Sequence, residues 1–479
     1  MAKSVTKNSI YYIIYTSLNL IFPFITGVYV SHVLIENLIG EVEAARNIAQ
    51  YFLILAYLGI PTYGIREIAK AKDNKEELNK VFSELVIINI ISSIVFSLLY
   101  LATILSVPTY RENTTLYLIT GGIVVLNLLN ITYLFEGLEE FGYICWRNLI
   151  FKILCFVLLT VLVKDDGDYL IYAALTIFGI AGNYLFNVFR AHKHVHFTLK
   201  NLNFKRHLKP VFFLVVVNLA IEIYTLVDVT MLNFLTTNES VAYYAYGSKI
   251  YKIFIHLLNS FTIVIVPRLT SYYKNKNKEE FNVLLSKTLT VLLLLAIPLT
   301  IGTFFTADYL ITAIYGQNYI SSASVLKILS IIFVISPVGY LLGSRVLLVT
   351  GKEKYMIYPV LAGSIVNIIA NYFLIKEYKE IGAAYGSLIS EFVVASIYIL
   401  LARKHIELRK FWINFAKIVL SAAVMTVVTF EVSKSGTPLS FATTAKEIIL
   451  AVSFYFGCLL VLNESTLNRY LNRIKKKLF

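Results

Sequence analysis

Long apolar runs bounded by charged residues dominate the hydropathy pattern of this chain. Each run has the roughly 20 mostly apolar residues that an α-helix needs to cross a bilayer core about 30 Å thick. The pattern therefore predicts an all-α polytopic membrane protein with fourteen transmembrane helices. The predicted spans are residues 10–31, 45–65, 82–105, 115–136, 144–163, 168–190, 211–235, 241–266, 284–306, 324–349, 356–375, 382–402, 413–432 and 444–463.

A six-residue motif occurs twice along this pattern. The stretch NKEELN over residues 74–79 opens the third span, and NKEEFN over 277–282 opens the ninth. Because six spans separate the copies, the two halves share one orientation and are related by an axis along the membrane normal. We predict an N-lobe of spans 1–6 in residues 1–200 and a C-lobe of spans 7–12 in residues 201–405. Residues 406–479 then hold spans 13 and 14 and a basic tail.

The basic residues follow the predicted topology. Most of the 43 lysines and arginines fall in the loops on the side of the two termini, and few fall on the opposite side. Positive charge is enriched in cytoplasmic loops, so both termini are predicted to be cytoplasmic. The net charge of +14 is mainly this topology signal, with some attraction to anionic lipid, and nucleic-acid binding is excluded as a function.

Composition narrows the chemistry further. The chain is 58% hydrophobic and only 15% charged, whereas soluble domains are about 25% charged. Its three cysteines lack the spacing of a zinc or redox site, and no G-x-x-x-x-G-K-[ST] loop for ATP occurs. His192, His194 and His196 alternate in a predicted loop, which we interpret as solvated. We expect no catalytic residue, no metal and no cofactor, so energy would come from ion gradients or from consumption of the substrate.

Span 8 carries a basic stripe. Its polar residues are spaced i, i+3, i+7 and i+10, which places them on one helical face, and they are Lys249, Lys252, His256 and Asn259. Ionisable residues inside a bilayer cost a few kcal/mol or more, so each one is a candidate functional residue. We predict that these four side chains bind substrate.

Span 7 carries an acidic stripe with similar spacing, formed by Asn218, Glu222, Thr225 and Asp228. Embedded acids titrate readily, so we predict that Glu222 or Asp228 couples transport to a proton or sodium gradient. The two stripes could line one cavity. The alternative is that Glu222 or Asp228 forms a buried structural ion pair with Lys249 or Lys252.

The first two spans add three candidates for substrate binding. Arg46 and Gln50 lie on one face early in span 2, and Asn19 belongs to a polar face of span 1. Arg46 precedes Lys249 by the same 203 positions that separate the two motif copies, so the repeat pairs a cation with a cation. Two such cations suit a phosphate or pyrophosphate that crosses the membrane desolvated. The alternative is an interfacial arginine that snorkels outward.

Several segments resemble Wzx-type polysaccharide flippases, which belong to the polysaccharide transporter family of the multidrug, oligosaccharidyl-lipid and polysaccharide exporter superfamily. The most specific is LGIPTYGIREIA over residues 58–69. The resemblance covers nearly the whole chain, and its other segments are residues 242–252, 267–269, 315–329, 351–354 and 382–391.

The resemblance implies two six-helix lobes plus two C-terminal helices. It also implies that undecaprenyl-pyrophosphate-linked oligosaccharide is flipped from the inner to the outer leaflet of a bacterial cytoplasmic membrane, for capsule, O-antigen or another envelope polymer. Membrane lipids and the polysaccharide polymerase machinery would be its partners. The family's cavity is cationic, and Arg46, Lys249 and Lys252 could fill that role here, although Glu222 and Asp228 make the cavity mixed.

Two alternative functions stay open. A proton- or sodium-coupled multidrug exporter of the same superfamily would use embedded acids. Glu222 and Asp228 are such acids, so this alternative stays open. A membrane polysaccharide polymerase would need an extensive outer loop to hold its catalytic residues. The longest predicted outer loop, near residues 307–323, is short, so we rank this enzyme third.

Overall fold

The computed structural model describes residues 5–407, 411–433, 440–464 and 467–468. Throughout these residues the secondary structure is helical, with α-, 3₁₀- and π-helical segments and no strand. Eleven helices are long and apolar enough to cross a membrane, and a shorter apolar helix covers Thr114–Leu129. The predicted fold class, an all-α polytopic membrane protein, is confirmed.

The predicted spans fall on these helices, with two adjustments. The predicted spans at 356–375 and 382–402 are the two parts of α18, which are separated by a kink at Lys379, where φ is 50° and ψ is −126°. The predicted outer loop near 307–323 is mostly helical, because α14 extends to Tyr315 and α15 begins at Ser321. Apolar runs underestimate helix length here because charged and polar residues extend the helices at both ends.

The chain forms two compact units, Met1–Ala242 and Tyr243–Phe479. The predicted lobe boundary at residue 200 falls in the segment 192–204, which joins α10 to α11. By its contacts, α11 belongs to the first unit. The predicted boundaries at 200 and 405 stay a prediction. The helices of the first unit are α1 (Val5–Ser31), α2 (Glu36–Tyr57), α3 (Ile60–Ala71), α4 (Lys75–Ser106), α5 (Pro108–Arg111), α6 (Thr114–Leu126), η1 (Asn127–Leu129), α7 (Thr132–Gly137), α8 (Phe141–Leu162), η2 (Asp166–Asp168), α9 (Tyr169–Ala181), α10 (Tyr184–Ala191) and α11 (Lys205–Leu235).

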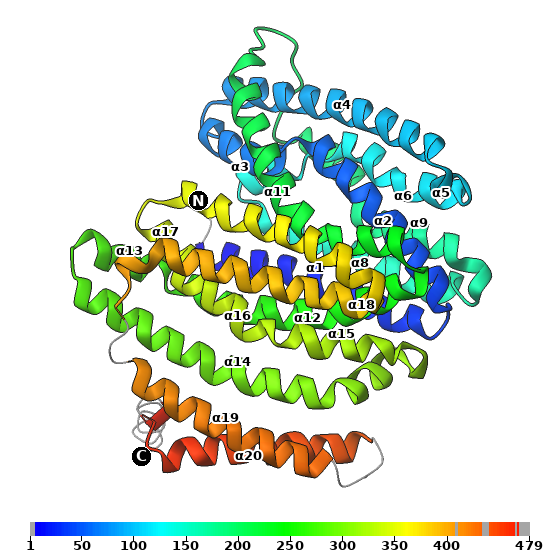
Figure 1. Cartoon of the computed structure of the whole chain (residues 1–479). Helices are drawn as coiled ribbons and strands as arrows, with labels where there is room; N and C mark the ends of the chain where they lie inside the picture. Colours follow the sequence, from blue (N-terminus) through cyan, green and yellow to red (C-terminus); the bar gives the residue numbers. More distant parts are fainter. Residues whose placement is uncertain (1–4, 408–410, 434–439, 465–466, 469–479) are drawn as a thin grey trace. The chain divides into compact units, whose positions relative to one another are not determined.

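The second unit starts within the first turns of α12 and ends with a helical hairpin, α19 and α20, that lies beside α14 (Figure 1). A π-helical segment, η4, continues α16, and the close approach of Gly343 to Tyr398 of α18 leaves no room for a Cβ atom there. The helices are α12 (Asn238–Val264), α13 (Val266–Lys274), α14 (Lys278–Tyr315), η3 (Gln317–Tyr319), α15 (Ser321–Ser330), α16 (Ile332–Gly339), η4 (Tyr340–Arg345), α17 (Val346–Val349), η5 (Glu353–Met356), α18 (Ile357–Ala402), η6 (Arg403–His405), α19 (Phe411–Ser433) and α20 (Phe441–Val461).

The repeated motif performs the same structural task in both units. Its first asparagine caps the helix that follows: the side chain of Asn74 accepts hydrogen bonds from the backbone N–H groups of Glu76 and Glu77, and that of Asn277 accepts one from Glu280. The acidic residues of the motif then lie in the first helical turn, where the helix dipole favours negative charge. The repeat therefore reflects two helices, α4 and α14, that begin in the same way.

The last asparagine of the motif holds the segment that follows the sixth predicted span of its lobe, which is span 6 for Asn79 and span 12 for Asn282. Asn79 Oδ1 accepts a hydrogen bond from the backbone N–H of His196 at 2.8 Å, and Asn282 Oδ1 accepts one from Glu407 at 2.9 Å. In the first unit Ser83 Oγ also accepts the N–H of Thr198. The histidine segment is a loop, as interpreted from the sequence, with His192 and His196 exposed, and its backbone is bound to α4.

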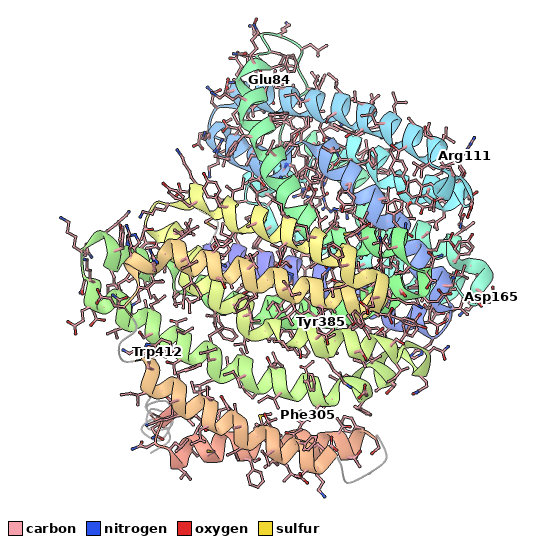
Figure 2. All side chains as sticks on the ribbon, viewed as in Figure 1. Glu84, Arg111, Asp165, Phe305, Tyr385 and Trp412 are labelled. Carbon is pink, nitrogen blue, oxygen red and sulfur yellow. The ribbon has the colours of Figure 1, made fainter. Side chains whose placement is uncertain are left out.

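A buried carboxylate fixes the start of α11 to α4. Glu84 is fully buried and accepts hydrogen bonds from the Asn203 N–H, from Arg206 Nε and Nη2, and lies 2.6 Å from His207 Nε2. His207 Nδ1 in turn lies 2.9 Å from the hydroxyl of Tyr63 on α3. Burial would lower the pKa of Arg206, but Glu84 and the partly exposed Glu77 outweigh it and raise that pKa. Figure 2 shows Glu84 at the end of α4 where α11 begins.

Candidate functional site

A cavity of about 460 Å³ lies within the first unit. Its wall is formed by α1, α2, the stretch from Asn130 to α7, α8, and the segment where α9 leads into α10. Most of the side chains that line it are polar or charged, although α1, α2, α8 and the α9–α10 segment lie in stretches that are long and apolar enough to cross a membrane. Buried polar side chains cost free energy unless they have partners, so a polar cavity at this depth indicates a use.

Helix α8 contributes two of the three cations of the cavity. Arg147, Asn148 and Lys152 lie within one arc of the helix, and each is buried, with 7%, 4% and 6% of the residue exposed. The opposite face of α8 exposes large apolar side chains suited to lipid, including Trp146 and Ile150. This amphipathic pattern orients α8 so that its charged face points inward.

Neither α8 cation forms an ion pair among the contacts of the described residues. Arg147 Nε and Nη1 are buried without a hydrogen-bond partner, and its guanidinium lies 5.4 Å from the centre of the Tyr143 ring. The ammonium of Lys152 lies 4.6 Å from the centre of the Phe22 ring. A buried guanidinium with two unused N–H groups is a strong anion-binding group, because its fork matches phosphate or carboxylate oxygens.

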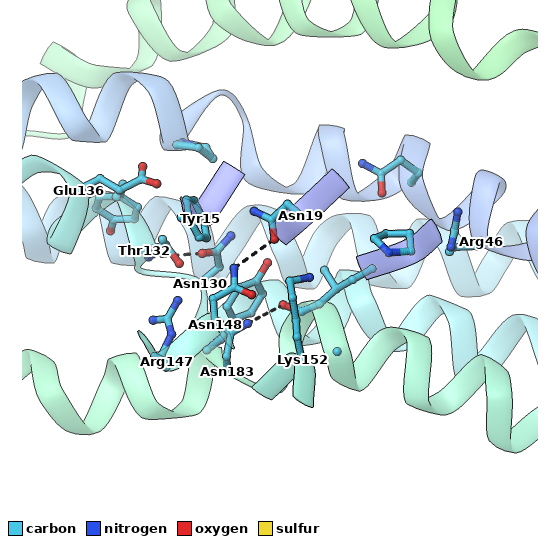
Figure 3. A pocket seen from close by; sticks show the side chains of 17 residues that line it. Tyr15, Asn19, Arg46, Asn130, Thr132, Glu136, Arg147, Asn148, Lys152 and Asn183 are labelled. Carbon is cyan, nitrogen blue, oxygen red and sulfur yellow. Dashed lines mark hydrogen bonds between the residues drawn. The ribbon is translucent and has the colours of Figure 1, made fainter. Parts of the chain in front are cut away.

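Amide side chains occupy the middle of the cavity. Asn148 Nδ2 donates to Asn19 Oδ1 across the gap between α8 and α1, at 3.1 Å, and Arg147 and Lys152 flank this bond (Figure 3). Asn130 and Asn183 also line the cavity. Glu136 of α7 and Arg46 of α2 lie at the two ends of the same view. The cavity thus combines three cations, one acid and several neutral hydrogen-bonding groups.

Three of the substrate-binding residues predicted from the sequence meet in this cavity. Asn19, Arg46 and Gln50 all line it. Arg46 Nη2 lies 2.7 Å from Oε2 of Glu43, and 31% of the Arg46 side chain is exposed. Much of its charge is therefore balanced by Glu43, which is itself buried. Whether these residues bind substrate stays a prediction.

The predicted basic stripe lies on α12, in the second unit. Lys249 and Asn259 are partly buried, whereas Lys252 and His256 are exposed within the described structure. The stripe faces away from the core of its own unit, where Ile255 and Leu258 pack against Phe333. The ammonium of Lys249 lies 4.1 Å from the ring centre of Tyr246. The spacing thus predicted one helical face correctly, and the role of that face stays a prediction.

The predicted acidic stripe lies on α11, in the first unit, and does not contribute to the described lining of the cavity. Thr225 donates its hydroxyl to Oε2 of Glu222 at 3.0 Å, and Asp228 is 5% exposed. Beside them, Asn47 and Tyr51 of α2 bond to Thr230 and so hold α11 against α2. The coupling role of Glu222 and Asp228 stays a prediction.

The sequence reasoning missed the residues that define the cavity's charge. Arg147 and Lys152 were counted with the loop charges on the side of the termini, although both fall inside the predicted span 144–163. The rule that selected Lys249, a cation inside a span, would have selected them too. Glu136 had no comparable signal because it is the last residue of the predicted span 115–136, and Asn183, inside the predicted span 168–190, carries no charge.

Comparison with known proteins gives the family of the chain. The family model described as "Polysaccharide biosynthesis protein" matches residues 5–273, more than half of the sequence. The chain belongs to this family. The matched region contains all the residues that line the cavity. The resemblance to Wzx-type flippases is therefore confirmed at the level of the family. A second family model, MatE, matches residues 214–373.

Relatives of the chain include proteins named for O-antigen transport and for capsular polysaccharide biosynthesis. A protein of Escherichia coli strain K12 named "Putative O-antigen transporter" is 24% identical over 409 residues, which cover 84% of this chain and 97% of that protein. The capsular polysaccharide biosynthesis protein CapF of Staphylococcus aureus is 31% identical over 144 residues, 29% of this chain and 35% of CapF.

Solved structures share the fold. The lipid II flippase MurJ, in an inward closed conformation, matches 91% of this chain and 98% of its own, with a TM-score of 0.63 and 18% identity. An inward-facing multidrug transporter of the MATE family matches 82% of this chain and 97% of its own, with a TM-score of 0.64 and 16% identity. At these identities the likeness establishes the fold alone.

Proposed function

We propose that this chain is a flippase that moves undecaprenyl-pyrophosphate-linked oligosaccharide across a bacterial cytoplasmic membrane. It would carry repeat units of capsule, O-antigen or another envelope polysaccharide from the inner to the outer leaflet by alternating access, with both termini cytoplasmic and without covalent chemistry. The relatives named for O-antigen transport and capsule synthesis, together with the family match, support the substrate class.

The observation that carries the proposal is Arg147, a buried arginine with two unpartnered N–H groups in a polar cavity. A pyrophosphate needs compensating cations when it leaves water, and Arg147 with Lys152 supplies two that no acid of the described chain neutralises at ion-pair distance. A lipid tail needs no such cavity, because it can remain in the bilayer. The headgroup would therefore enter the protein while the tail stays in lipid.

The test is a flipping assay in proteoliposomes that contain the full chain and a fluorescent undecaprenyl-pyrophosphate glycan. We expect the wild type to expose the inner-leaflet glycan to a membrane-impermeant reagent, and Arg147→Gln to do so much more slowly. Arg190→Gln is the control, because Arg190 pairs with Glu140 and does not line the cavity. No flipping by folded wild-type protein would contradict the proposal.

A proton- or sodium-coupled multidrug exporter is the second candidate. The MatE match over residues 214–373 favours it, since that region contains Glu222 and Asp228. The same proteoliposomes distinguish the two functions when they are loaded with a cationic dye and energised by a proton or sodium gradient. Gradient-dependent dye transport that is lost in Glu222→Gln and Asp228→Asn, without glycan flipping, would select the exporter.

A further inference from the structure

Four side chains of the first-unit cavity present polar atoms that are buried and have no hydrogen-bond partner. Besides Nε and Nη1 of Arg147, these atoms are Oδ1 of Asn148, Oδ1 of Asn183 and the hydroxyl of Tyr133. All four residues line the cavity, and each is more than nine-tenths buried. An unsatisfied buried polar group costs about 1–3 kcal/mol, so a cluster of four in one cavity is an unusual concentration.

The chemistry of these atoms is complementary to one kind of ligand. Arg147 offers N–H donors for an anion. The amide of Asn183 is oriented by its Nδ2, which donates to the backbone carbonyl of Ile180 at 3.1 Å, so the free atom is an acceptor. The Nδ2 of Asn148 likewise donates to Asn19, which leaves its Oδ1 as an acceptor. An anionic group next to hydrogen-bond donors would satisfy all of them.

We propose that Asn148 and Asn183 form a sugar subsite beside the phosphate-binding Arg147, and that it recognises hydroxyl or acetamido N–H donors on the sugar attached to the diphosphate. This inference rests on the proposed function and deepens it. The subsite would select substrates by their first sugar, because a buried acceptor left unpaired penalises any ligand that lacks the matching donor. Arg147 and Lys152 would bind every diphosphate, whatever sugar follows.

The position of Asn148 supports a shared site rather than two separate ones. It is adjacent to Arg147 in sequence and lies between Arg147 and Lys152 in the cavity (Figure 3). A diphosphate and its attached sugar are covalently joined, so groups that read them must also be adjacent. Ordered water is the alternative occupant of these groups, since water can donate to two acceptors at once.

The test measures the binding of two probes to the full chain in lipid nanodiscs: farnesyl diphosphate, and farnesyl diphosphate joined to N-acetylglucosamine. The readout is the ratio of the two dissociation constants, because a purely structural loss weakens both probes alike. We expect the wild type to prefer the glycosylated probe. Asn148→Leu and Asn183→Leu should each lower this preference about three- to tenfold, the loss of roughly one hydrogen bond.

Asn187→Leu is the matched control. Asn187 is a fully buried asparagine on α10 that bonds to Thr132 and does not line the cavity, so its replacement should leave the ratio unchanged. An unchanged ratio in both cavity variants, or an equal fall in Asn187→Leu, would overturn the inference. Wild-type protein that binds both probes equally would overturn it and leave the proposed function standing. Wild-type protein that binds neither probe would contradict both.

Discussion

The fifth spans of the two predicted lobes, α8 in the first unit and the first part of α18 in the second, differ sharply in charge. In the first unit α8 buries Arg147 and Lys152 in a polar cavity. In the second unit the corresponding span is the first part of α18, and residues 357–375 contain no acidic or basic side chain. It buries Asn367 and Asn371 instead, and the amide of Asn371 donates to that of Asn367 at 3.2 Å.

The difference separates what the duplicated fold requires from what transport requires. The shared motif gives α4 and α14 the same caps and the same linker contacts, and both fifth spans bury asparagines. A buried amide can be satisfied by a neighbour, whereas a buried cation costs several kcal/mol more unless it meets an anion. The cations of α8 are therefore not part of the common scaffold, and their cost indicates a ligand.

The largest expected effect comes from removing that charge. Arg147→Ala should slow glycan flipping about 30-fold or more, since truncation of a desolvated charge that binds an anion costs roughly 2 kcal/mol or more. Arg147→Lys should retain more activity than Arg147→Ala because it keeps the charge and loses only the fork. The initial flipping rate in proteoliposomes is the measurement. Equal rates for wild type and Arg147→Ala would remove the distinction between the two fifth spans.

A second difference between the units concerns the buried contacts of Glu84 with Arg206 and His207, which join α4 to the start of α11. Glu84→Gln should lower the free energy of unfolding by about 2 kcal/mol, because it leaves the buried His207 and the partly buried Arg206 without their carboxylate. The matched position in the second unit is Lys287, which is exposed, so Lys287→Gln should change stability little. Thermal unfolding in detergent measures both. A similar shift in the two variants would mean that the buried contacts of Glu84 contribute no more to stability than the exposed Lys287.

The hydrogen bonds from the motif asparagines, Asn79 and Asn282, to the linker backbone should contribute similarly to stability in the two units. Asn79→Ala and Asn282→Ala each remove one side-chain acceptor of a linker N–H, so each should cost about 1 kcal/mol. Hydrogen exchange followed by mass spectrometry should show faster exchange at His196 in the first variant and at Glu407 in the second. Faster exchange in only one variant would show that the last asparagine of the motif stabilises the linker in one unit alone.

The smallest expected effect concerns the basic stripe of α12. Lys249→Gln should slow flipping only about threefold, because a partly exposed cation contributes roughly 1 kcal/mol or less. Lys252→Gln should have a similar or smaller effect, since Lys252 is exposed. A loss as large as that of Arg147→Ala would place substrate binding on both units and would restore the importance that the sequence repeat assigned to Lys249.

The fold could be predicted from the sequence almost completely. Among the described residues, apolar runs marked the helices that are long and apolar enough to cross a membrane, and the motif at 74–79 and 277–282 marked the duplication, because both signals are local. The binding residues were harder. The cavity joins Asn19, Arg46, Asn148 and Asn183 from four different helices, and helix rotation about its own axis is set by packing that hydropathy does not encode.

Particular residues show where the limit lies. Arg46 was found because it stands alone in an apolar segment, but its partner Glu43 could be recognised only in the structure. Arg147 and Lys152 lie inside the predicted span 144–163 and were overlooked because they were grouped with the basic residues on the side of the termini. The polar backbone contacts of residues 196–203 with α4 join positions more than 100 residues apart, so no local pattern signals them.

The most direct test of the central claim is the location of the headgroup. A structure of the full chain in nanodiscs, saturated with an undecaprenyl-diphosphate-linked sugar, should show the diphosphate against Arg147 and Lys152 in the first-unit cavity. The attached sugar should then lie beside Asn148 and Asn183. A bound headgroup that contacts the α12 stripe at Lys249 and Lys252 while the first-unit cavity stays empty would contradict the claim.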